Sequence, residues 1–162
     1  VDTNSLRRRA SPEDLRAFAF LYPVMDYPRM GAILRNNLSL ADLPLYTYAL
    51  RPIRLHERFA FCYLPQGCSQ NLLGILADFF LSIEEVDFVA LCARSDDRLI
   101  FSVRSERPEW NAAVIIKAAL RGLGSGGGHR EMAGAVFYEP AAFDEEQVYR
   151  RFRDLLAGFS DV

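Results

Sequence analysis

The chain has 162 residues, of which 51% are hydrophobic and 25% charged, and its formal net charge at pH 7 is −2. This length suits about one domain with a core of its own, and the near-neutral charge argues against nonspecific binding of nucleic acid by bulk charge. No apolar run approaches the ~18 residues of a membrane helix, and three cysteines without a C-x-x-C pair fit a reducing compartment, so we expect a cytoplasmic protein that does not bind a membrane.

Three short helices are predicted over the first fifty-odd residues. The segment Ser11-Pro12-Glu13-Asp14 combines a hydroxyl cap, a proline in the first turn and two acids, which is typical of a helix start. This helix should end at Pro23, because proline cannot continue it. Further helices are predicted over residues 28–36 and 40–50.

From about His56 the pattern changes to strands alternating with helices. Apolar runs and period-2 alternation predict four strands, over Phe59–Leu64, Val86–Ala93, Arg98–Ser105 and Ala135–Tyr138. Helices are predicted after the capping residues Ser69, Asn111 and Asp144. A turn at residues 95–97 requires an antiparallel pair. The order therefore predicts an α/β fold, with a mixed β-sheet domain and flanking helices over residues 56–162 and a short helical segment before it.

The segment Gly122–Gly128 has five glycines in seven residues. Two explanations stay open: a flexible turn after a helix, or a loop whose bare N–H groups converge on an anion. The spacing satisfies G-x-G-x-x-G, but the dinucleotide fingerprint follows a strand and this run follows a helix. The nucleoside-triphosphate loop requires a lysine where Gly128 and His129 stand, so it is excluded.

His129 and Arg104 favour the anion-binding explanation. His129 directly follows the glycines and can donate a hydrogen bond. Arg104 ends a predicted strand, and its planar fork fits two phosphate oxygens. The two would meet if their strand ends lie at the same edge of the sheet. The alternatives are a solvated histidine and an arginine paired with a nearby acid, such as Glu106 or Glu109.

The segment Phe101-Ser102-Val103-Arg104-Ser105, followed after a helix by Gly126-Gly127-Gly128-His129-Arg130-Glu131-Met132-Ala133-Gly134, resembles the C-terminal DHH-associated domain of RecJ-like and oligoribonuclease-like phosphoesterases. Met132 departs from the usual alanine. The resemblance covers about residues 56–162. It implies a substrate-binding domain that holds the phosphate end of a short oligonucleotide or nucleotide phosphate through Arg104, Gly126, Gly127, Gly128 and His129.

The beginning of the chain is similar to the end of the DHH catalytic domain, so residues 1–55 are expected to be its last helices and a linker. Asp2 matches the last metal-binding aspartate there. The chain has no Asp-His-His motif, so the resemblance implies an upstream catalytic domain that binds Mn or Mg. For this fragment we expect no catalytic residue, no cofactor and no hydrolysis, although the whole protein would be a hydrolase of the exonuclease type.

The same domain also occurs in alanyl-tRNA synthetases, where it is a non-catalytic nucleic-acid-binding and dimerisation module, and this is the alternative function. A homodimer stays open. The remaining candidates have structural explanations: a solvated loop for Arg7–Arg9, a hydrophobic anchor for Trp110, and core thiols for Cys62, Cys68 and Cys92.

Overall fold

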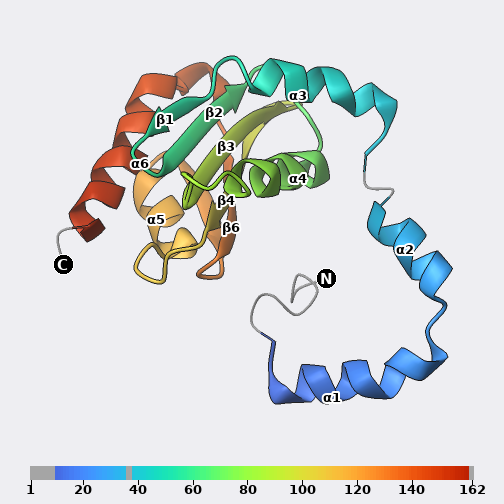
Figure 1. The fold of residues 1–162 in the computed structure, drawn as a ribbon. Coiled ribbons are helices and arrows are strands. Elements are labelled where there is room, and N and C mark those ends of the chain that lie inside the picture. Colours follow the sequence, from blue (N-terminus) through green and yellow to red (C-terminus); the bar gives the residue numbers. More distant parts are fainter. Residues whose placement is uncertain (1–9, 36–37, 161–162) are drawn as a thin grey trace. The chain divides into compact units, whose positions relative to one another are not determined.

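A computed structural model describes residues 10–35 and 38–160, and the chain divides into two compact units between Ser39 and Leu40. The helices are α1 (Pro12–Leu21), α2 (Tyr27–Arg35), α3 (Leu43–Ala49), α4 (Gln70–Leu81), α5 (Ala112–Ala119) and α6 (Glu145–Ser160), and short 3-10 turns cover Tyr22–Val24, Leu40–Asp42 and Pro140–Ala142. The strands are β1 (Arg54–His56), β2 (Phe59–Leu64), β3 (Phe88–Ser95), β4 (Arg98–Ser105), β5 (Gly124–Gly128) and β6 (Met132–Phe137) (Figure 1).

The first unit contains α1 and α2. Ser11 begins α1 as predicted: its hydroxyl accepts from the Asp14 N–H at 3.1 Å, and the Asp14 carboxylate accepts from the Ser11 N–H at 2.8 Å. No residue of 10–33 is buried, and large apolar side chains such as Phe20 and Val24 lie in solvent. α1 and α2 therefore have no hydrophobic core of their own in the described part of the chain.

The second unit is a six-stranded mixed sheet in the order β1-β2-β3-β4-β6-β5. β2 and β3 are parallel, and the other four neighbouring pairs are antiparallel. The four predicted strands are all present, which confirms the α/β class with a mixed sheet. The predicted helix over residues 40–50 begins instead as a 3-10 turn and continues as α3, which belongs to this second unit. The expected domain boundary after residue 55 stays a prediction.

Two strands are absent from the prediction. β1 has only three residues, and β5 is the glycine run itself, which was expected to be a loop. The expectation of a loop is wrong because Gly124–Gly128 pairs along its whole length with β6. β5 is thereby the edge of the sheet beyond β6.

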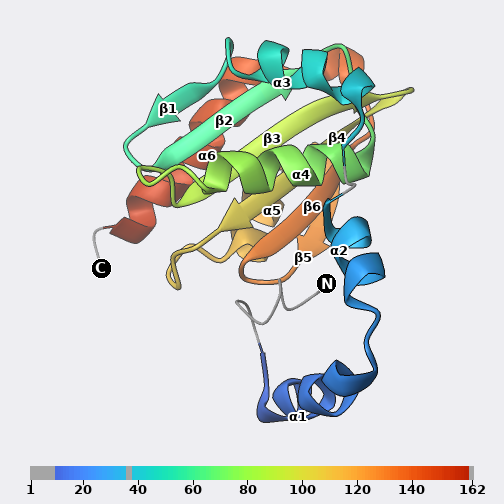
Figure 2. The ribbon, with the colours of Figure 1, turned by 45° about the vertical axis from the view of Figure 1, so that its right-hand side comes forward.

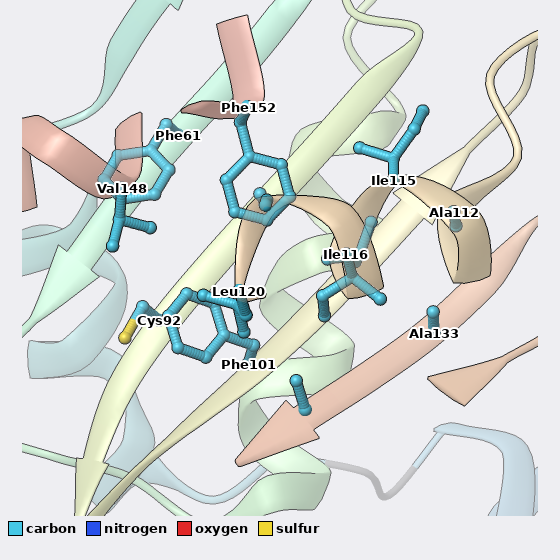
Figure 3. Packing of buried hydrophobic residues seen from close by; sticks show 14 of the residues in the cluster. Phe61, Cys92, Phe101, Ala112, Ile115, Ile116, Leu120, Ala133, Val148 and Phe152 are labelled. Carbon is cyan, nitrogen blue, oxygen red and sulfur yellow. The ribbon is translucent and has the colours of Figure 1, made fainter. Parts of the chain in front are cut away.

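Helices cover both faces of the sheet, with α5 and α6 on one face and α3 and α4 on the other (Figure 2). On the first face, Phe152 of α6 and Ile115 and Ile116 of α5 lie over Phe61 and Phe101 of the strands (Figure 3). Trp110 is 3% exposed and packs edge-on against Phe88, as expected of a hydrophobic anchor. Both clusters lie within residues 40–160, so the second unit has a complete core.

The three cysteines lie in or beside this core. Cys62 and Cys92 are buried, and Cys68 is half-buried. Burial raises the pKa of the Cys62 thiol to about 12 and that of Cys68 to about 11, because a thiolate would lose its hydration. These groups are therefore protonated, unreactive thiols at neutral pH.

Asp87, which precedes β3, connects the segments that carry Arg58 and Arg107. It lies near the end of β4 that is remote from the β3–β4 turn. The Asp87 carboxylate accepts from the guanidinium groups of both Arg58 and Arg107, and Arg107 also lies over the ring of Trp110. These hydrogen bonds, from Arg58 first, lower the pKa of Asp87 below its ordinary value of 3.8. The side chain of Asp87 is only 16% exposed, so water screens the pairs weakly.

Because the pKa of Asp87 is lower in the folded state, this carboxylate stabilises the fold above pH 3.8, and the contribution disappears as the pH falls further. We expect Asp87→Asn to lower the free energy of unfolding at pH 7 by about 1.5–3 kcal/mol. The difference from the wild type should shrink towards pH 2–3, as measured by urea unfolding at several pH values. A difference that is constant from pH 7 to pH 2.5 would contradict the assignment.

Candidate functional site

Arg104 and the glycine strand lie at the same end of the sheet. β4 and β5 are both antiparallel to β6, so they run in the same direction. Both end beside the start of β6, one on each side of it. Arg104 is opposite Met132, and the His129 N–H donates to the Met132 carbonyl at 2.7 Å. With one strand between them, β4 and β5 are about 10 Å apart. A single nucleotide end can therefore span both.

The guanidinium of Arg104 is buried and is held by protein partners at its Nε and Nη1 atoms. Arg104 is 7% exposed, and its Nε donates to Asp78 Oδ1 of α4 at 2.8 Å. Nη1 donates to the Ser102 hydroxyl at 3.0 Å and to the Val103 carbonyl at 3.1 Å. The acidic partner is thus Asp78, which is far away in the sequence, and the pairing with Glu106 or Glu109 considered from the sequence is wrong.

The glycines of β5 do not form the expected nest of converging N–H groups. Gly124, Gly126 and Gly128 approach β6 so closely that an added Cβ would lie 2.3–2.7 Å from atoms of that strand. Gly128 also has φ of +148°, which other residues rarely adopt. Close pairing with β6 therefore explains these three glycines, and the extended backbone keeps successive N–H groups apart.

Hydrogen bonds in an antiparallel pair alternate between the two sides of a strand. Since His129 donates to Met132, the N–H groups of Gly127 and Ser125 point towards β6, and those of Gly126 and Gly128 point away from it. The Gly124 N–H, on the outward side, donates to the Leu120 carbonyl at 3.1 Å. The open edge of β5 therefore presents the N–H groups of Gly126 and Gly128.

Gly127 differs from the other glycines of β5. Among the described residues beyond its chain neighbours, the only heavy atom within 4 Å of a Cβ added there is Cε of Lys117, at 3.8 Å. Gly127 is opposite Gly134, which is opposite Ser102, so the three small residues form a row across three strands. Residues opposite one another share a face of the sheet, and this row lies beside the row of Arg104 and Met132. Met132, at the start of β6, is 40% exposed.

The turn that carries His129 is held by α5. The carbonyls of His129 and Arg130 accept from the N–H groups of Ala113 and Ala112, and Asn111 Oδ1 accepts from Ala113 and Val114 as the predicted cap. The first amides of α5 are thus occupied. The His129 side chain is exposed at the end of the glycine strand, where it can donate to a ligand.

The described residues contain no group of three or more His, Cys, Asp or Glu side chains that could hold a metal ion. The residues present in 10–35 and 38–160 therefore do not fit a divalent-metal centre of the expected kind. Asp2 and Arg7–Arg9 lie outside the described residues. Within the described helices, none is long and apolar enough to cross a membrane.

Two surface hollows lie away from the Arg104 end of β4. One is lined by Ala118, Arg121, Arg151, Asp154 and Leu155, and the other by residues 122–125, 137–139 and 142. In the first, Arg151 Nη1 donates to the carbonyls of Ala119 and Arg121 at the end of α5. Its guanidinium therefore already neutralises the negative end of that helix.

The arrangement at the ends of β4 and β5 offers hydrogen-bond donors to an anion. The Arg104 guanidinium and the exposed His129 imidazole are donors that phosphate oxygens accept from, whereas the N–H groups of Gly126 and Gly128 face the outer edge of the sheet, away from β6 and Arg104. Gly74 and Asp78 of α4 were not expected from the sequence. The signal that could have revealed them is a glycine inside a predicted helix with an acid one turn later.

The model of the DHHA1 domain family matches residues 56–157. Among solved structures, an exopolyphosphatase-related protein from Bacteroides fragilis matches 98% of this chain with a TM-score of 0.73 and 18% identity. The C-Ala domain of Aquifex aeolicus alanyl-tRNA synthetase matches 66% of this chain with a TM-score of 0.50 and 21% identity, and 96% of that domain is covered.

RecJ from Thermus thermophilus, in complex with Mg²⁺, matches 91% of this chain with a TM-score of 0.57 and 20% identity. The chain spans 47% of the exopolyphosphatase-related protein and 21% of RecJ. No curated protein matches the chain. At these identities, the structural matches show a shared fold.

Proposed function

Because this chain belongs to the DHHA1 domain family, we propose that it is the substrate-binding part of a metal-dependent DHH phosphoesterase. Its ligand is the phosphate end of a short oligonucleotide or of a nucleotide phosphate. Arg104 holds the phosphate, the glycine strand lets the ligand approach the backbone, and His129 donates from the end of that strand. Hydrolysis belongs to a DHH domain that binds Mn or Mg.

The observation that carries this proposal is the position of Arg104 beside the row of Ser102, Gly134 and Gly127. The Arg104 guanidinium is 7% exposed and is held in one orientation by the partners of Nε and Nη1. Its Nη2 group has the weakest contacts and is the one that can donate to a phosphate oxygen. Gly127 supports the proposal independently, because no packing atom in residues 10–35 and 38–160 comes closer than 3.8 Å to account for the absence of a side chain. A ligand lying on the backbone would account for it.

The exposed apolar side chains of α1 and α2 support a partner for the first unit. Phe20 of α1 is 80% exposed and Ile33 of α2 is 63% exposed, which is unusual for residues of a stable isolated helix. We propose that these helices complete a DHH catalytic domain. The match to the solved exopolyphosphatase-related protein covers 98% of this chain but only 47% of that longer chain. A fold shared over both units of this chain is consistent with that assignment.

The alternative function is the non-catalytic module found in alanyl-tRNA synthetases. The observation in its favour is that the C-Ala domain is covered over 96% of its length, so its fold is nearly all contained here. This match covers only 66% of the present chain. The alternative predicts binding of tRNA and no preference for a phosphorylated nucleotide end.

Titration calorimetry of the 162-residue chain tests the proposed ligand. Adenosine 3′,5′-bisphosphate should bind saturably, and adenosine should not, because a guanidinium and an imidazole bind charged phosphate oxygens much more strongly than an uncharged nucleoside. A phosphorylated RNA trinucleotide should also bind. Equal affinity for adenosine and its bisphosphate, or binding of tRNA alone, would contradict the proposal.

Removing residues 1–39 should leave the fold of the second unit intact. Both hydrophobic clusters lie within residues 40–160, so we expect the midpoint of thermal unfolding of the 40–162 chain to stay within about 3 °C of the longer chain. Circular dichroism melting measures this. The control is Phe152→Ala in the longer chain, which should lower the midpoint strongly. Loss of cooperative unfolding in the truncated chain would contradict the division at residue 39.

A further inference from the structure

Gly74 and Asp78 lie one turn apart on the side of α4 that faces Arg104. Asp78 accepts from Nε at 2.8 Å, and the carbonyl of Gly74 accepts from Nη2 at 3.4 Å. Glycine is unfavourable inside a helix, but here it has a structural reason: a Cβ at position 74 would lie 3.1 Å from Nη2 of Arg104. The helix therefore leaves room for the guanidinium at one position and provides a carboxylate at the next turn.

The contacts of the guanidinium are unequal in length. Nε and Nη1 have partners at 2.8–3.1 Å. The two contacts of Nη2, to Gly74 and to Asp78 Oδ2, are 3.4 and 3.5 Å long, beyond the usual range for a strong hydrogen bond. An incoming anion would thus displace the partners of Nη2 most easily. The fork is fixed on its Nε and Nη1 sides and has its weakest contacts at Nη2.

We propose that Gly74 and Asp78 are positioning residues that hold Arg104 in the one conformation in which it binds phosphate. This inference rests on the proposed function of Arg104 as the phosphate ligand. An arginine side chain has much rotamer freedom, which a ligand must otherwise restrict on binding. A guanidinium that is ordered beforehand by α4 removes that requirement.

The charge of Asp78 has an opposite effect, because a carboxylate also repels the anion and competes for Arg104. Its side chain is 53% exposed, so water weakens the repulsion. The proposal requires that orientation of Arg104 contributes more to binding than this repulsion subtracts. Gly74→Ala separates the two effects, since it displaces the guanidinium without changing any charge.

The test is calorimetric titration of the 162-residue chain with adenosine 3′,5′-bisphosphate. Asp78→Ala and Gly74→Ala should each weaken binding by about fivefold or more, because a charge-assisted hydrogen bond or its geometry is lost. Asp78→Asn should lie between, since its amide oxygen still accepts from Nε. The matched controls are Asp97→Ala in the exposed β3–β4 turn and Gly158→Ala in α6, where a new Cβ meets no atom of another described segment within 4 Å. Both controls should bind like the wild type.

A second measurement follows Arg104 directly and does not depend on a ligand. In ¹⁵N NMR spectra, the Arg104 Nε–H should exchange with water faster in Asp78→Ala and Gly74→Ala than in the wild type. Tighter binding by Asp78→Ala together with unchanged binding by Gly74→Ala would overturn the positioning role and leave repulsion as the main effect. If Arg104→Ala binds like the wild type, the proposed function fails. The NMR result is independent of that outcome. If the Arg104 Nε–H exchanges as slowly in Asp78→Ala and Gly74→Ala as in the wild type, the positioning role fails.

Discussion

Replacing Arg104 with alanine is expected to weaken binding of adenosine 3′,5′-bisphosphate by about 10- to 150-fold. The variant removes at least one charge-assisted hydrogen bond to phosphate, and such bonds contribute about 1.5–3 kcal/mol each. Arg104→Lys should recover only part of the affinity, because a single ammonium group cannot keep the contacts of Nε and Nη1 inside the protein and also donate to phosphate in the place of Nη2. Calorimetric titration at fixed ionic strength measures both variants.

Arg98→Ala is the matched control for Arg104→Ala. Arg98 is an exposed arginine at the other end of β4, so its removal changes the net charge equally without changing the proposed site. Binding by Arg98→Ala should equal that of the wild type. Equal weakening by both variants would mean that only the overall charge matters, and Arg104 would lose its specific role.

Gly128→Ala is expected to have the largest effect on stability among the glycine variants. A Cβ at position 128 would lie 2.5 Å from the Met132 carbonyl oxygen and 2.6 Å from Ala133 Cα, and the residue has φ of +148°. Neither neighbour is a flexible side chain, so β5 must shift away from β6. We expect a loss of about 2–4 kcal/mol in the free energy of unfolding, measured by urea denaturation.

Gly127→Ala is the neighbouring control, and it separates folding from binding. Within the part of the chain that the structure describes, its Cβ would meet only the flexible end of Lys117, at 3.8 Å. The free energy of unfolding should therefore stay within about 0.5 kcal/mol of the wild type. If a ligand lies on this backbone, the same variant should nevertheless weaken binding of the bisphosphate. Strong destabilisation by Gly127→Ala would mean that packing, rather than a ligand, requires glycine there.

The elements with clear periodicity could be predicted from the sequence. The alternation of Leu99, Phe101 and Val103 and the polar turn before them predict the β3–β4 hairpin, and all three side chains are buried on one face. The capping residues Ser69 and Asn111 also begin the helices expected of them. In these segments, local preference and burial favour the same structure.

β5 could not be predicted because its stability comes from tertiary contacts. Glycine has little preference for strands, and Gly124–Gly128 is a strand only because Ala133–Phe137 lies beside it. The partner of Arg104 could not be predicted for the same reason, because it too is set by tertiary contacts. Asp78 is 26 residues away in the sequence and reaches Arg104 because α4 packs across β3 and β4, whereas sequence proximity suggested Glu106 or Glu109.

The central claim is that a phosphate end binds at the end of the sheet where β4 and β5 finish on either side of β6, at Arg104, Gly127 and His129. Titration of ¹⁵N-labelled chain with adenosine 3′,5′-bisphosphate, followed by NMR, tests it most directly. We predict saturable shifts concentrated at the Arg104 Nε–H and at the amides of Gly126–His129 and Gly134. Shifts concentrated instead at Arg121 and Arg151 in the hollow between α5 and α6, or no saturable shift at the β4 and β5 ends, would contradict the claim.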